Sequence, residues 1–519
     1  MPNIRKFRAR LANVEAPLVP VKSRRRRWHR QCAVLIGAVL MLGSCSESGP
    51  PVGSIGHVAA YFGGLSADEP RAALVGRDVL SAGGSAFDAA VAMYFAMAVT
   101  MPSAAGLGGG GVCTIYNARD NKAESLDFRP GAPASPAPDG RWAAAVPGSV
   151  RGMFALHARY GFLRWEQLVL SAERLARFGF PASRALAERV AGSAERLQQM
   201  PDARRVFAGS EEGSLVAEGG TFRRFQLAAT IGRLRTVGPG DLYNGVLARH
   251  FVDGVTAAGG WLTVDDMRNY RPVWRPTIER SFGDHKVHFA DGTSGGRIGA
   301  DIWQRMAEGG GIAGGEPADR LYRLAEAARA AYAEAGARPD IDYGTAGFVI
   351  MDRMLNGVAC TFTMNEAFGS GRTAGQTDML IAHAASDPVS VGAALSPVVV
   401  ANHSNPRAIA ALSGAGDSAA PAALIAAAGP AFDENVPLTG ALEAFRAAPG
   451  TGDRTVLLER DAGRTTASAI AARGARVFPV AGLGRVNIMY CPQGLDQQPK
   501  LCDVRTDPRG HGYAINAEF

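Results

Sequence analysis

The stretch that decides how this chain folds is Asp-Tyr-Gly-Thr-Ala-Gly-Phe-Val-Ile-Met at residues 342–351. Its threonine, Thr345, stands at the entrance of an apolar run that predicts a β-strand. A hairpin then returns the chain through Cys-Thr-Phe-Thr-Met-Asn at 360–365, which brings the hydroxyl of Thr363 and the amide of Asn365 beside Thr345. A threonine acts as a nucleophile when a cut in front of it frees its own α-amine as a base. The bond that precedes Thr345 is therefore the point on which the function of this chain depends.

Helical and strand patterns occur in blocks on both sides of this hairpin. Helices are predicted over 67–82, 85–101, 149–200, 238–270, 319–335, 418–428 and 466–473. Strands are predicted over 112–117, 281–290, 396–401, 408–413, 455–458, 476–480 and 486–490. The second of these helices is apolar on nearly every side, which is typical of a helix buried between layers. Because regular βαβ alternation is missing, the pattern predicts an α+β fold with antiparallel strands rather than a doubly wound sheet.

The positive charge of the chain is concentrated in a leader. Residues 1–44 hold ten of the 55 Lys and Arg residues and one of the 48 Asp and Glu residues, so the rest of the chain has a balance of −2. The basic character therefore belongs to the leader, and we expect no nucleic-acid partner. The chain has 519 residues, of which 47% are hydrophobic, and this is enough for one large domain or two ordinary ones.

The leader has the form of an export signal. A basic region at 24–30 precedes an apolar run at 32–42, which is too short to span a bilayer comfortably. The run leads into Leu-Gly-Ser-Cys at 42–45, which resembles a bacterial lipobox. We therefore expect 1–44 to be a lipoprotein signal peptide and Cys45 to carry the lipid. An ordinary signal peptide with an incidental cysteine is the alternative.

The residues after this cysteine predict where the mature protein resides. Residues 45–56 resemble a tether, and Ser46 favours an anchor in the outer membrane. Ser-Arg-Arg at 23–25 gives only faint support for twin-arginine export. We expect an exported, periplasmic protein that is attached to a membrane by its lipid.

Four cysteines lie in the body of the chain. Cys113 and Cys360 stand in apolar strand patterns, where free thiols behave as small buried hydrophobes, so we expect both to be free. Cys491 and Cys502 close a short loop near the C-terminus. In an oxidising compartment these two either pair or stay free, depending on the geometry of the turn between them.

A glycine loop and the histidines could indicate a cofactor or a metal. Gly106, Gly108 and Gly111 satisfy the spacing G-x-G-x-x-G, but a helix precedes this loop and a strand follows it, the reverse of a dinucleotide site. We expect close backbone approach there instead. His285 and His288 are three positions apart on a strand and face opposite sides of it, so we expect no catalytic metal and no cofactor.

A run of motifs in one order resembles the gamma-glutamyltranspeptidase family over most of residues 57–517. The motifs are Asp88-Ala-Ala-Val-Ala, Ala105-Gly-Leu-Gly-Gly-Gly-Gly, Leu126-Asp-Phe-Arg129, Val146-Pro-Gly-Ser-Val-Arg-Gly, Ala258-Gly-Gly-Trp-Leu-Thr-Val-Asp-Asp-Met, Thr293-Ser-Gly-Gly296, Phe368-Gly-Ser-Gly371, Leu395-Ser-Pro-Val-Val-Val and Thr506-Asp-Pro-Arg-Gly. The resemblance implies a four-layer αββα N-terminal-nucleophile fold with two central antiparallel sheets. It also implies a precursor that cuts itself into a large-subunit region, 57–344, and a small-subunit region, 345–519, which together form one composite domain.

The same resemblance implies roles for residues around the cut. The cut falls between Gly344 and Thr345, and the freed hydroxyl of Thr345 is the nucleophile. Its α-amine, with an ordinary pKa of about 7.7–8.0, is a suitable base near neutral pH. Thr363 matches the threonine that supports the nucleophile. Gly416 matches the first residue of a Gly-Gly pair whose backbone N–H groups stabilise the oxyanion.

Three further residues match positions that hold the glutamyl group. Asn365 corresponds to a residue that binds the α-carboxylate, and Asp387 to one that binds the α-amine. Arg129 matches the arginine that clamps the α-carboxylate, a bidentate pairing for which lysine is no substitute. The alternative for Arg129 is a structural salt bridge with a neighbouring acid.

The chain also departs from the family pattern. Ala346-Gly347 replaces a Thr-His pair after the nucleophile, Ala393-Ala394 replaces a pair of serines, and Asp417 replaces the second glycine of the oxyanion pair. A carboxylate at that last position would repel an oxyanion unless it points away. The segment between the helix at 319–335 and the nucleophile is also shorter than is usual in the family.

These observations lead to one expected function and one alternative. We expect a hydrolase or acyltransferase that acts on a small-molecule γ-glutamyl amide, such as a glutathione-like compound, or on a related amide. Its subunits would come from one precursor. The alternative is an uncut, inactive family member that serves as a binding or scaffold lipoprotein.

Overall fold

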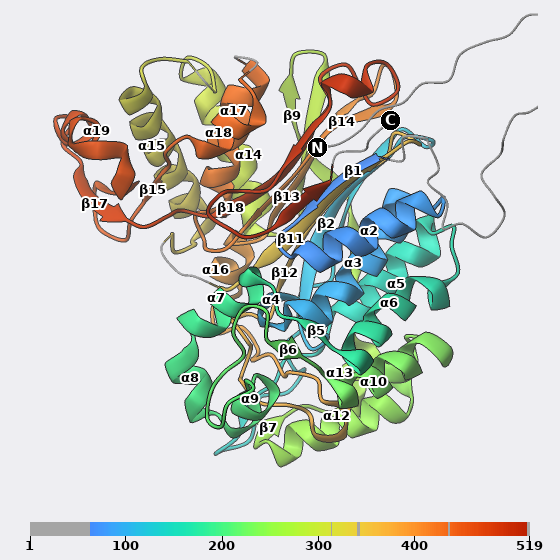
Figure 1. The fold of residues 1–519 in the computed structure, drawn as a ribbon. Coiled ribbons are helices and arrows are strands. Elements are labelled where there is room, and N and C mark those ends of the chain that lie inside the picture. Colours follow the sequence, from blue (N-terminus) through green and yellow to red (C-terminus); the bar gives the residue numbers. More distant parts are fainter. Residues whose placement is uncertain (1–62, 313, 340–342, 434–435, 516–519) are drawn as a thin grey trace, which may run out of the picture. The chain divides into compact units, whose positions relative to one another are not determined.

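Two antiparallel sheets form the centre of the computed structural model, which describes residues 63–515 apart from 313, 340–342 and 434–435 (Figure 1). The first sheet has the order β20-β1-β11-β12-β2-β3-β8. Its strands are β1 (Gly63–Ala67), β2 (Gly110–Asn117), β3 (Lys122–Asp127), β8 (Val273–Arg275), β11 (Ala346–Asp352), β12 (Gly357–Thr363) and β20 (Tyr513–Ile515). The second sheet has the order β19-β18-β14-β13-β10-β9. Its strands are β9 (Thr277–Phe282), β10 (His285–Ala290), β13 (Ser396–Asn402), β14 (Arg407–Ala415), β18 (Arg485–Tyr490) and β19 (Asp503–Arg505).

Helices cover the outer face of each sheet (Figure 1). The first sheet packs against α2 (Pro70–Ser81), α3 (Ala86–Thr100) and α5 (Ser149–Tyr160), and α6 (Trp165–Phe178) packs on α3. The second packs against α14 (Ser294–Glu308) and α17 (Ala420–Asp433), and α15 (Pro317–Ala335) packs on α14. Small and β-branched residues fill the space between the sheets, among them Val349, Ala359 and Ala411. The predicted four-layer αββα arrangement is confirmed.

The all-apolar helix α3 lies at the centre of the first helix layer, as its composition predicts. All fifteen of its residues are buried. Ser85 caps its N-terminus: the Ser85 side chain accepts a bond from the Asp88 N–H at 3.1 Å, and the Asp88 carboxylate accepts the Ser85 N–H at 2.9 Å. This reciprocal capping box satisfies N–H groups that have no partner inside the helix. The carboxylate of Asp352, at the end of β11, accepts the N–H of Ala86 at 2.7 Å and joins the helix to the central hairpin.

Shorter elements surround the four layers. The helices are α4 (Pro102–Ala105), α7 (Arg184–Gly192), α8 (Ala194–Gln199), α9 (Pro201–Val206), α10 (Phe225–Thr236), α11 (Asp241–Asn244), α12 (Val246–Ala257), α13 (Val264–Asn269), α16 (Pro388–Ala393), α18 (Leu438–Glu443) and α19 (Gly463–Ala471). The strands are β4 (Trp142–Ala143), β5 (Phe180–Pro181), β6 (Thr221–Phe222), β7 (Gly260–Trp261), β15 (Ala447–Pro449), β16 (Thr455–Glu459) and β17 (Arg476–Val480). No helix in the described part of the chain has both the length and the apolar character needed to cross a membrane.

Several predicted elements differ from those observed. The helix expected over 67–82 begins three residues later, because Gly63–Ala67 pairs with β11 as strand β1. The strand expected over 281–290 is a hairpin of β9 and β10. The helix α14 was not predicted. It begins at a glycine-rich stretch that lacks an early apolar repeat, where Thr293 caps the helix by accepting the N–H of Gly296 at 3.1 Å.

The expectation that Cys113 and Cys360 are free is wrong. They lie directly opposite each other on β2 and β12 and form a disulfide, with Cα atoms 4.1 Å apart. The register of two strands that are 247 residues apart in sequence decides this pairing. Cys491 and Cys502 also form a disulfide. The predicted signal peptide, Cys45 and tether lie outside the described residues.

Candidate active site

Thr345 is the last residue before β11, and its side chain is fully buried. Its Oγ1 accepts a hydrogen bond from the N–H of Gly416 at 2.7 Å. The same hydroxyl donates to the carbonyl of Ala394 at 3.4 Å. Gly416 follows β14 with φ +107, a left-handed conformation that favours glycine. The neighbouring sheet thus presents a backbone donor to the predicted nucleophile.

Two guanidinium groups contact the backbone carbonyls at Gly344 and Thr345. Arg189 donates from Nη1 to the carbonyl of Gly344 at 3.2 Å and from Nη2 to the carbonyl of Thr345 at 2.8 Å. Arg485, at the start of β18, donates to the carbonyl of Thr345 at 3.2 Å. Sequence reasoning missed both residues, because an arginine on an amphipathic helix such as α7 has the pattern of an ordinary surface residue. These contacts place two positive charges close to the backbone at the expected cut.

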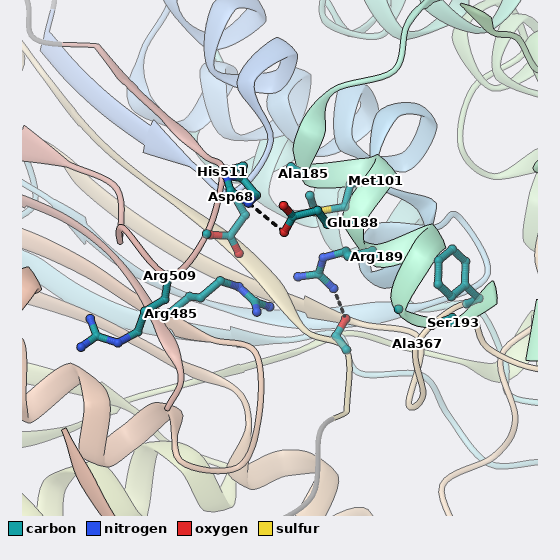
Figure 2. A pocket seen from close by; sticks show the side chains of 14 residues that line it. Asp68, Met101, Ala185, Glu188, Arg189, Ser193, Ala367, Arg485, Arg509 and His511 are labelled. Carbon is teal, nitrogen blue, oxygen red and sulfur yellow. Dashed lines mark hydrogen bonds and ion pairs between the residues drawn. The ribbon is translucent and has the colours of Figure 1, made fainter. Parts of the chain in front are cut away.

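A cavity of about 270 Å³ opens beside this peptide bond (Figure 2). Gly344, Arg189 and Arg485 line it together with an ion pair between His511 and Glu188, whose Nε2 and Oε2 atoms are 2.8 Å apart. Arg509 and Asp68 also line the cavity. The expected cut therefore adjoins a pocket lined by three arginines and two carboxylates.

The central hairpin has the strand register predicted from the sequence. Ala346 pairs with Phe362, so Thr345 and Thr363 stand at the next position on adjacent strands. The Oγ1 of Thr363 accepts the N–H of Asn365 at 2.8 Å. No hydrogen bond within the described residues joins Thr363 to Thr345, and the supporting role of Thr363 stays a prediction.

Asn365 and Arg129 line a second cavity, of about 290 Å³. Asn365 has φ +63 and donates from Nδ2 to the carbonyl of His383 at 2.7 Å. Arg129 follows β3 and forms a bidentate pair with Asp127, with Nε–Oδ1 at 3.0 Å and Nη2–Oδ2 at 2.8 Å. Burial acts to lower the pKa of Arg129, but Asp127 overrides it and the pKa is raised. The salt bridge considered as an alternative role for Arg129 is therefore present, and Arg129 still reaches the cavity.

The short helix α16 connects this cavity to Thr345. A Cβ at Gly392 would lie 3.2 Å from Nη1 of Arg129, so this nitrogen lies against the helix. Two residues later, the carbonyl of Ala394 accepts the hydroxyl of Thr345. Arg129 and Thr345 therefore approach the same turn of the chain.

Asp387 caps the N-terminus of α16. Its carboxylate accepts the N–H of Ser390 at 3.0 Å and the Ser390 hydroxyl at 2.6 Å, and it lies 3.7 Å from Nε of Arg338. The Ser390 hydroxyl and N–H are the main causes that lower the pKa of Asp387. The carboxylate thus stays charged, as binding of an ammonium group requires.

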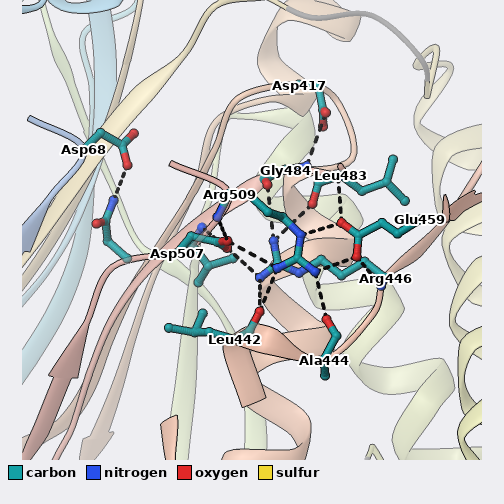
Figure 3. Close-up of polar contacts among 12 residues, drawn as sticks. Asp68, Asp417, Leu442, Ala444, Arg446, Glu459, Leu483, Gly484, Asp507 and Arg509 are labelled. Carbon is teal, nitrogen blue, oxygen red and sulfur yellow. Dashed lines mark hydrogen bonds and ion pairs between the residues drawn. The ribbon is translucent and has the colours of Figure 1, made fainter. Parts of the chain in front are cut away.

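The structure accommodates two of the departures from the family pattern, Asp417 and Gly347. The carboxylate of Asp417 accepts the N–H of Ala419 at 2.8 Å and the N–H of Gly484 at 3.2 Å, so it is held by other donors (Figure 3). At Gly347, a Cβ would lie 2.0 Å from the hydroxyl of Ser413. A side chain at that position would collide with the second sheet.

A polar network fixes the first residues of β11. The carboxylate of Asp68 accepts the N–H of Gly347 at 3.0 Å and the amide of Asn487 at 2.8 Å. Asn487 belongs to β18 and also accepts the hydroxyl of Ser66 from β1 at 2.7 Å. Because β18 belongs to the second sheet, this network joins the two sheets next to Thr345. No group of three or more His, Cys, Asp or Glu side chains in the described part of the chain could hold a metal.

Comparison with known proteins agrees with the motifs. The family model described as Gamma-glutamyltranspeptidase matches residues 72–343, more than half of the chain. Glutathione hydrolase 3 of Arabidopsis thaliana is 28% identical over 392 residues, which cover 64% of this chain and 61% of the relative. The Glutathione hydrolase proenzyme of Escherichia coli (strain K12) is 27% identical over 419 residues, which cover 66% of this chain and 72% of the relative.

Solved structures agree on the fold. A cephalosporin acylase from Bacillus halodurans superposes with a TM-score of 0.75 at 21% identity, covering 90% of this chain and 98% of that one. The chain spans about three fifths of the length of the Arabidopsis relative. One conclusion follows from the strand order of the sheets, from the buried Thr345 immediately before β11 and from the family match. The chain belongs to the gamma-glutamyltranspeptidase family, within the N-terminal-nucleophile hydrolase superfamily.

Proposed function

We propose that this chain is a self-processing hydrolase or acyltransferase of γ-glutamyl or related amides, with Thr345 as its nucleophile. The observation that carries the proposal is the 2.7 Å hydrogen bond from the Gly416 N–H to Thr345 Oγ1 at the start of a central strand. The same N–H stands next to the attacking atom, so it lies within reach of an oxyanion that forms on the acyl carbon bound to Oγ1. The family match supports the class of reaction, and relatives named glutathione hydrolases support a γ-glutamyl donor.

The reaction follows from the freed N-terminus. The α-amine of Thr345 takes the proton of its own hydroxyl, and Oγ1 attacks the γ-carbonyl carbon of the substrate. The Gly416 N–H donates to the oxyanion that forms. The amide C–N bond then breaks, the leaving amine receives the proton, and an acyl ester remains on Thr345. Water or an acceptor amine attacks the ester and restores the hydroxyl.

Recognition of the donor rests on Arg129, Asn365 and Asp387. Arg129 and Asn365 line one cavity, and Arg129 lies against the helix that Asp387 caps. Arg129 would bind the α-carboxylate of the donor at one end, and Asp387 would bind its α-amine at the other. Ala393 and Ala394 carry methyl groups in place of the serine hydroxyl groups of the family pattern, so we propose weaker recognition of the glutathione glutamyl group than the family pattern provides.

Mass analysis of the purified protein tests the proposal. We expect two polypeptides, the smaller of which begins at Thr345. Thr345→Ala should give one uncut chain with no hydrolysis of a chromogenic γ-glutamyl anilide. A wild-type chain that stays intact after long incubation would contradict the proposal and favour an inactive family member.

We also propose that the protein is exported to the periplasm and anchored by a lipid on Cys45. The leader motif and the disulfides Cys113–Cys360 and Cys491–Cys502 support an oxidising compartment. Cells fed a radiolabelled fatty acid should label the wild-type protein but not Cys45→Ala. Equal labelling of both would contradict the anchor.

A further inference from the structure

Arg189 spans the bond that is expected to be cut. Its Nη1 and Nη2 donate to the carbonyls of Gly344 and Thr345 at 3.2 and 2.8 Å, one on each side of that bond. The side chain is held in place by α7, whose Ala185, Leu186 and Val190 are buried. Ser183 caps this helix by accepting the N–H of Leu186 at 3.2 Å. A fixed helix therefore carries the guanidinium to the peptide.

Self-cleavage places its oxyanion on the chain itself. When Oγ1 of Thr345 attacks the carbonyl carbon of Gly344, the negative charge develops on the carbonyl oxygen of Gly344 itself. The Gly416 N–H donates to the attacking Oγ1. Arg189 already donates to the oxygen that becomes negative, and a charged donor gains strength as that charge grows.

We infer that Arg189 is the catalytic residue that stabilises the oxyanion of self-cleavage at Gly344, an inference that rests on the proposed function. The attack makes a bond between Oγ1 and the carbonyl carbon of Gly344. The C–N bond then breaks, the nitrogen of Thr345 takes the hydroxyl proton, and an ester joins Gly344 to Oγ1. Water attacks the ester carbon, Gly344 leaves as a carboxylate, and Oγ1 regains a proton.

The cavity beside Arg189 supports the second half of this sequence (Figure 2). Gly344 and Arg189 both line this space of about 270 Å³, which is large enough for the attacking water. The new carboxylate of Gly344 forms next to the guanidinium that held its carbonyl. Arg189 therefore binds both the developing oxyanion and the final anion, which opposes re-formation of the ester.

Rates of self-cleavage in full-length variants test the inference. The fraction of cut chain is followed by intact mass spectrometry after purification of the precursor. We expect Arg189→Met to slow the cut by 100-fold or more, in the range reported for loss of one oxyanion donor. Arg189→Lys keeps the charge but not the fork that reaches both carbonyls, and we expect about a tenfold loss. Arg184→Met is the matched control, because Arg184 lies on the same helix and pairs with Glu218 at the surface.

The outcomes separate this inference from the proposed function. If the wild type stays uncut, the proposed function fails and the inference fails with it. If the wild type is cut and Arg189→Met is cut at the same rate, the inference alone is wrong. Where Arg189→Met does not fold, Arg189→Lys decides, and a rate within twofold of the wild type would overturn the inference.

Hydroxylamine distinguishes oxyanion stabilisation from a merely structural role. Hydroxylamine cleaves an ester but not an amide under mild conditions. We expect the slowed Arg189→Met precursor to contain no hydroxylamine-sensitive ester, because formation of the ester is the step that is lost. Accumulation of such an ester would overturn the inference, because it would mean that Oγ1 attacks normally without the guanidinium.

Discussion

Gly344 is constrained by its conformation as well as by its place before the proposed nucleophile, Thr345. It has φ +62, and a Cβ there would lie 2.7 Å from the Cα of Ala367. Gly336 has a similar φ of +68 at the C-terminus of α15, where a Cβ would meet nothing within 4 Å. Both glycines have a left-handed backbone, but only Gly344 is closely packed, against Ala367. Comparing them therefore isolates the effect of close packing at the proposed cut.

Replacing these glycines should have unequal effects. In a Thr345→Ala background, which keeps the chain uncut, Gly336→Ala should lower the free energy of unfolding by about 1 kcal/mol through backbone strain. Gly344→Ala should lower it by about 2–4 kcal/mol, because overpacking adds to the strain. Urea unfolding measures both values. Equal losses would show that Ala367 moves aside without cost.

Arg129 should matter for substrate and not for self-cleavage. Its fork is already paired with Asp127, so a lysine would lose both that pair and the planar contact with a carboxylate. We expect Arg129→Lys to raise KM for a γ-glutamyl anilide by about 10- to 100-fold, in line with the loss of a charge-assisted hydrogen bond. The rate of self-cleavage should stay unchanged. Arg159→Lys, which alters a pair with Glu124, is the control.

At the scale of the elements, patterns that are local in sequence were predictable. The hairpin of β11 and β12 and the buried helix α3 each follow from one continuous run of residues. The cross-strand pairing of Cys113 with Cys360 and the contact of Arg189 with Gly344 depend on segments far apart in the chain. No local pattern in the sequence predicts these contacts between distant segments. The residues matched to substrate positions came from the family resemblance, which carries such long-range information.

A buried histidine on β10 illustrates a feature that only the fold creates. The hydroxyl of Thr277 lies 2.8 Å from Nδ1 of His288, and Nε2 of His288 lies 2.9 Å from Nε2 of His403. Nδ1 of His403 lies 2.7 Å from Oδ1 of Asn121. When the Thr277 hydroxyl donates to Nδ1, the neutral ring of His288 keeps its Nε2–H as the donor to His403. Burial, with smaller contributions from His403 and Lys286, lowers the pKa of His288 to about 3.

The low pKa of His288 predicts a loss of stability in mild acid. The unfolded chain binds a proton at this histidine below its ordinary pKa of about 6.5, whereas the folded chain does so only near 3. The contribution of His288 to the free energy of unfolding is therefore fully present above pH 6.5. It decreases as pH falls from about 6.5 toward 3, by about 2 kcal/mol at pH 5. Urea unfolding of His288→Gln should show a correspondingly flatter dependence on pH. The same substitution at His250, on α12, should leave the slope as in the wild type.

At the scale of the whole molecule, a buried ionic cluster ties the segment between β19 and β20 to the β15–β17 sheet (Figure 3). Arg446 precedes β15 and pairs with Asp507 at 2.6 Å, and both side chains are almost wholly buried. Arg509 pairs with Glu459 on β16 and also lines the cavity beside Gly344. Burial lowers the pKa of Arg446, and Asp507 opposes that effect. The cluster thus connects the peripheral β15–β17 sheet to the wall of the cavity beside Gly344.

Removing one partner of the Arg446–Asp507 pair should lower the free energy of unfolding more than removing both partners. Arg446→Met leaves Asp507 as a buried carboxylate whose remaining partners include the Val486 N–H and Arg509, and we expect a loss of about 3–5 kcal/mol in the free energy of unfolding. Arg446→Met combined with Asp507→Leu removes the stranded charge and should recover part of that loss, as apolar replacement of a buried pair often does. Arg77→Met, which breaks an exposed pair with Asp78, should change stability by less than about 1 kcal/mol. A double variant as unstable as the single one would mean that Asp507 acts mainly through its bonds to backbone and Arg509, and not as the partner of Arg446.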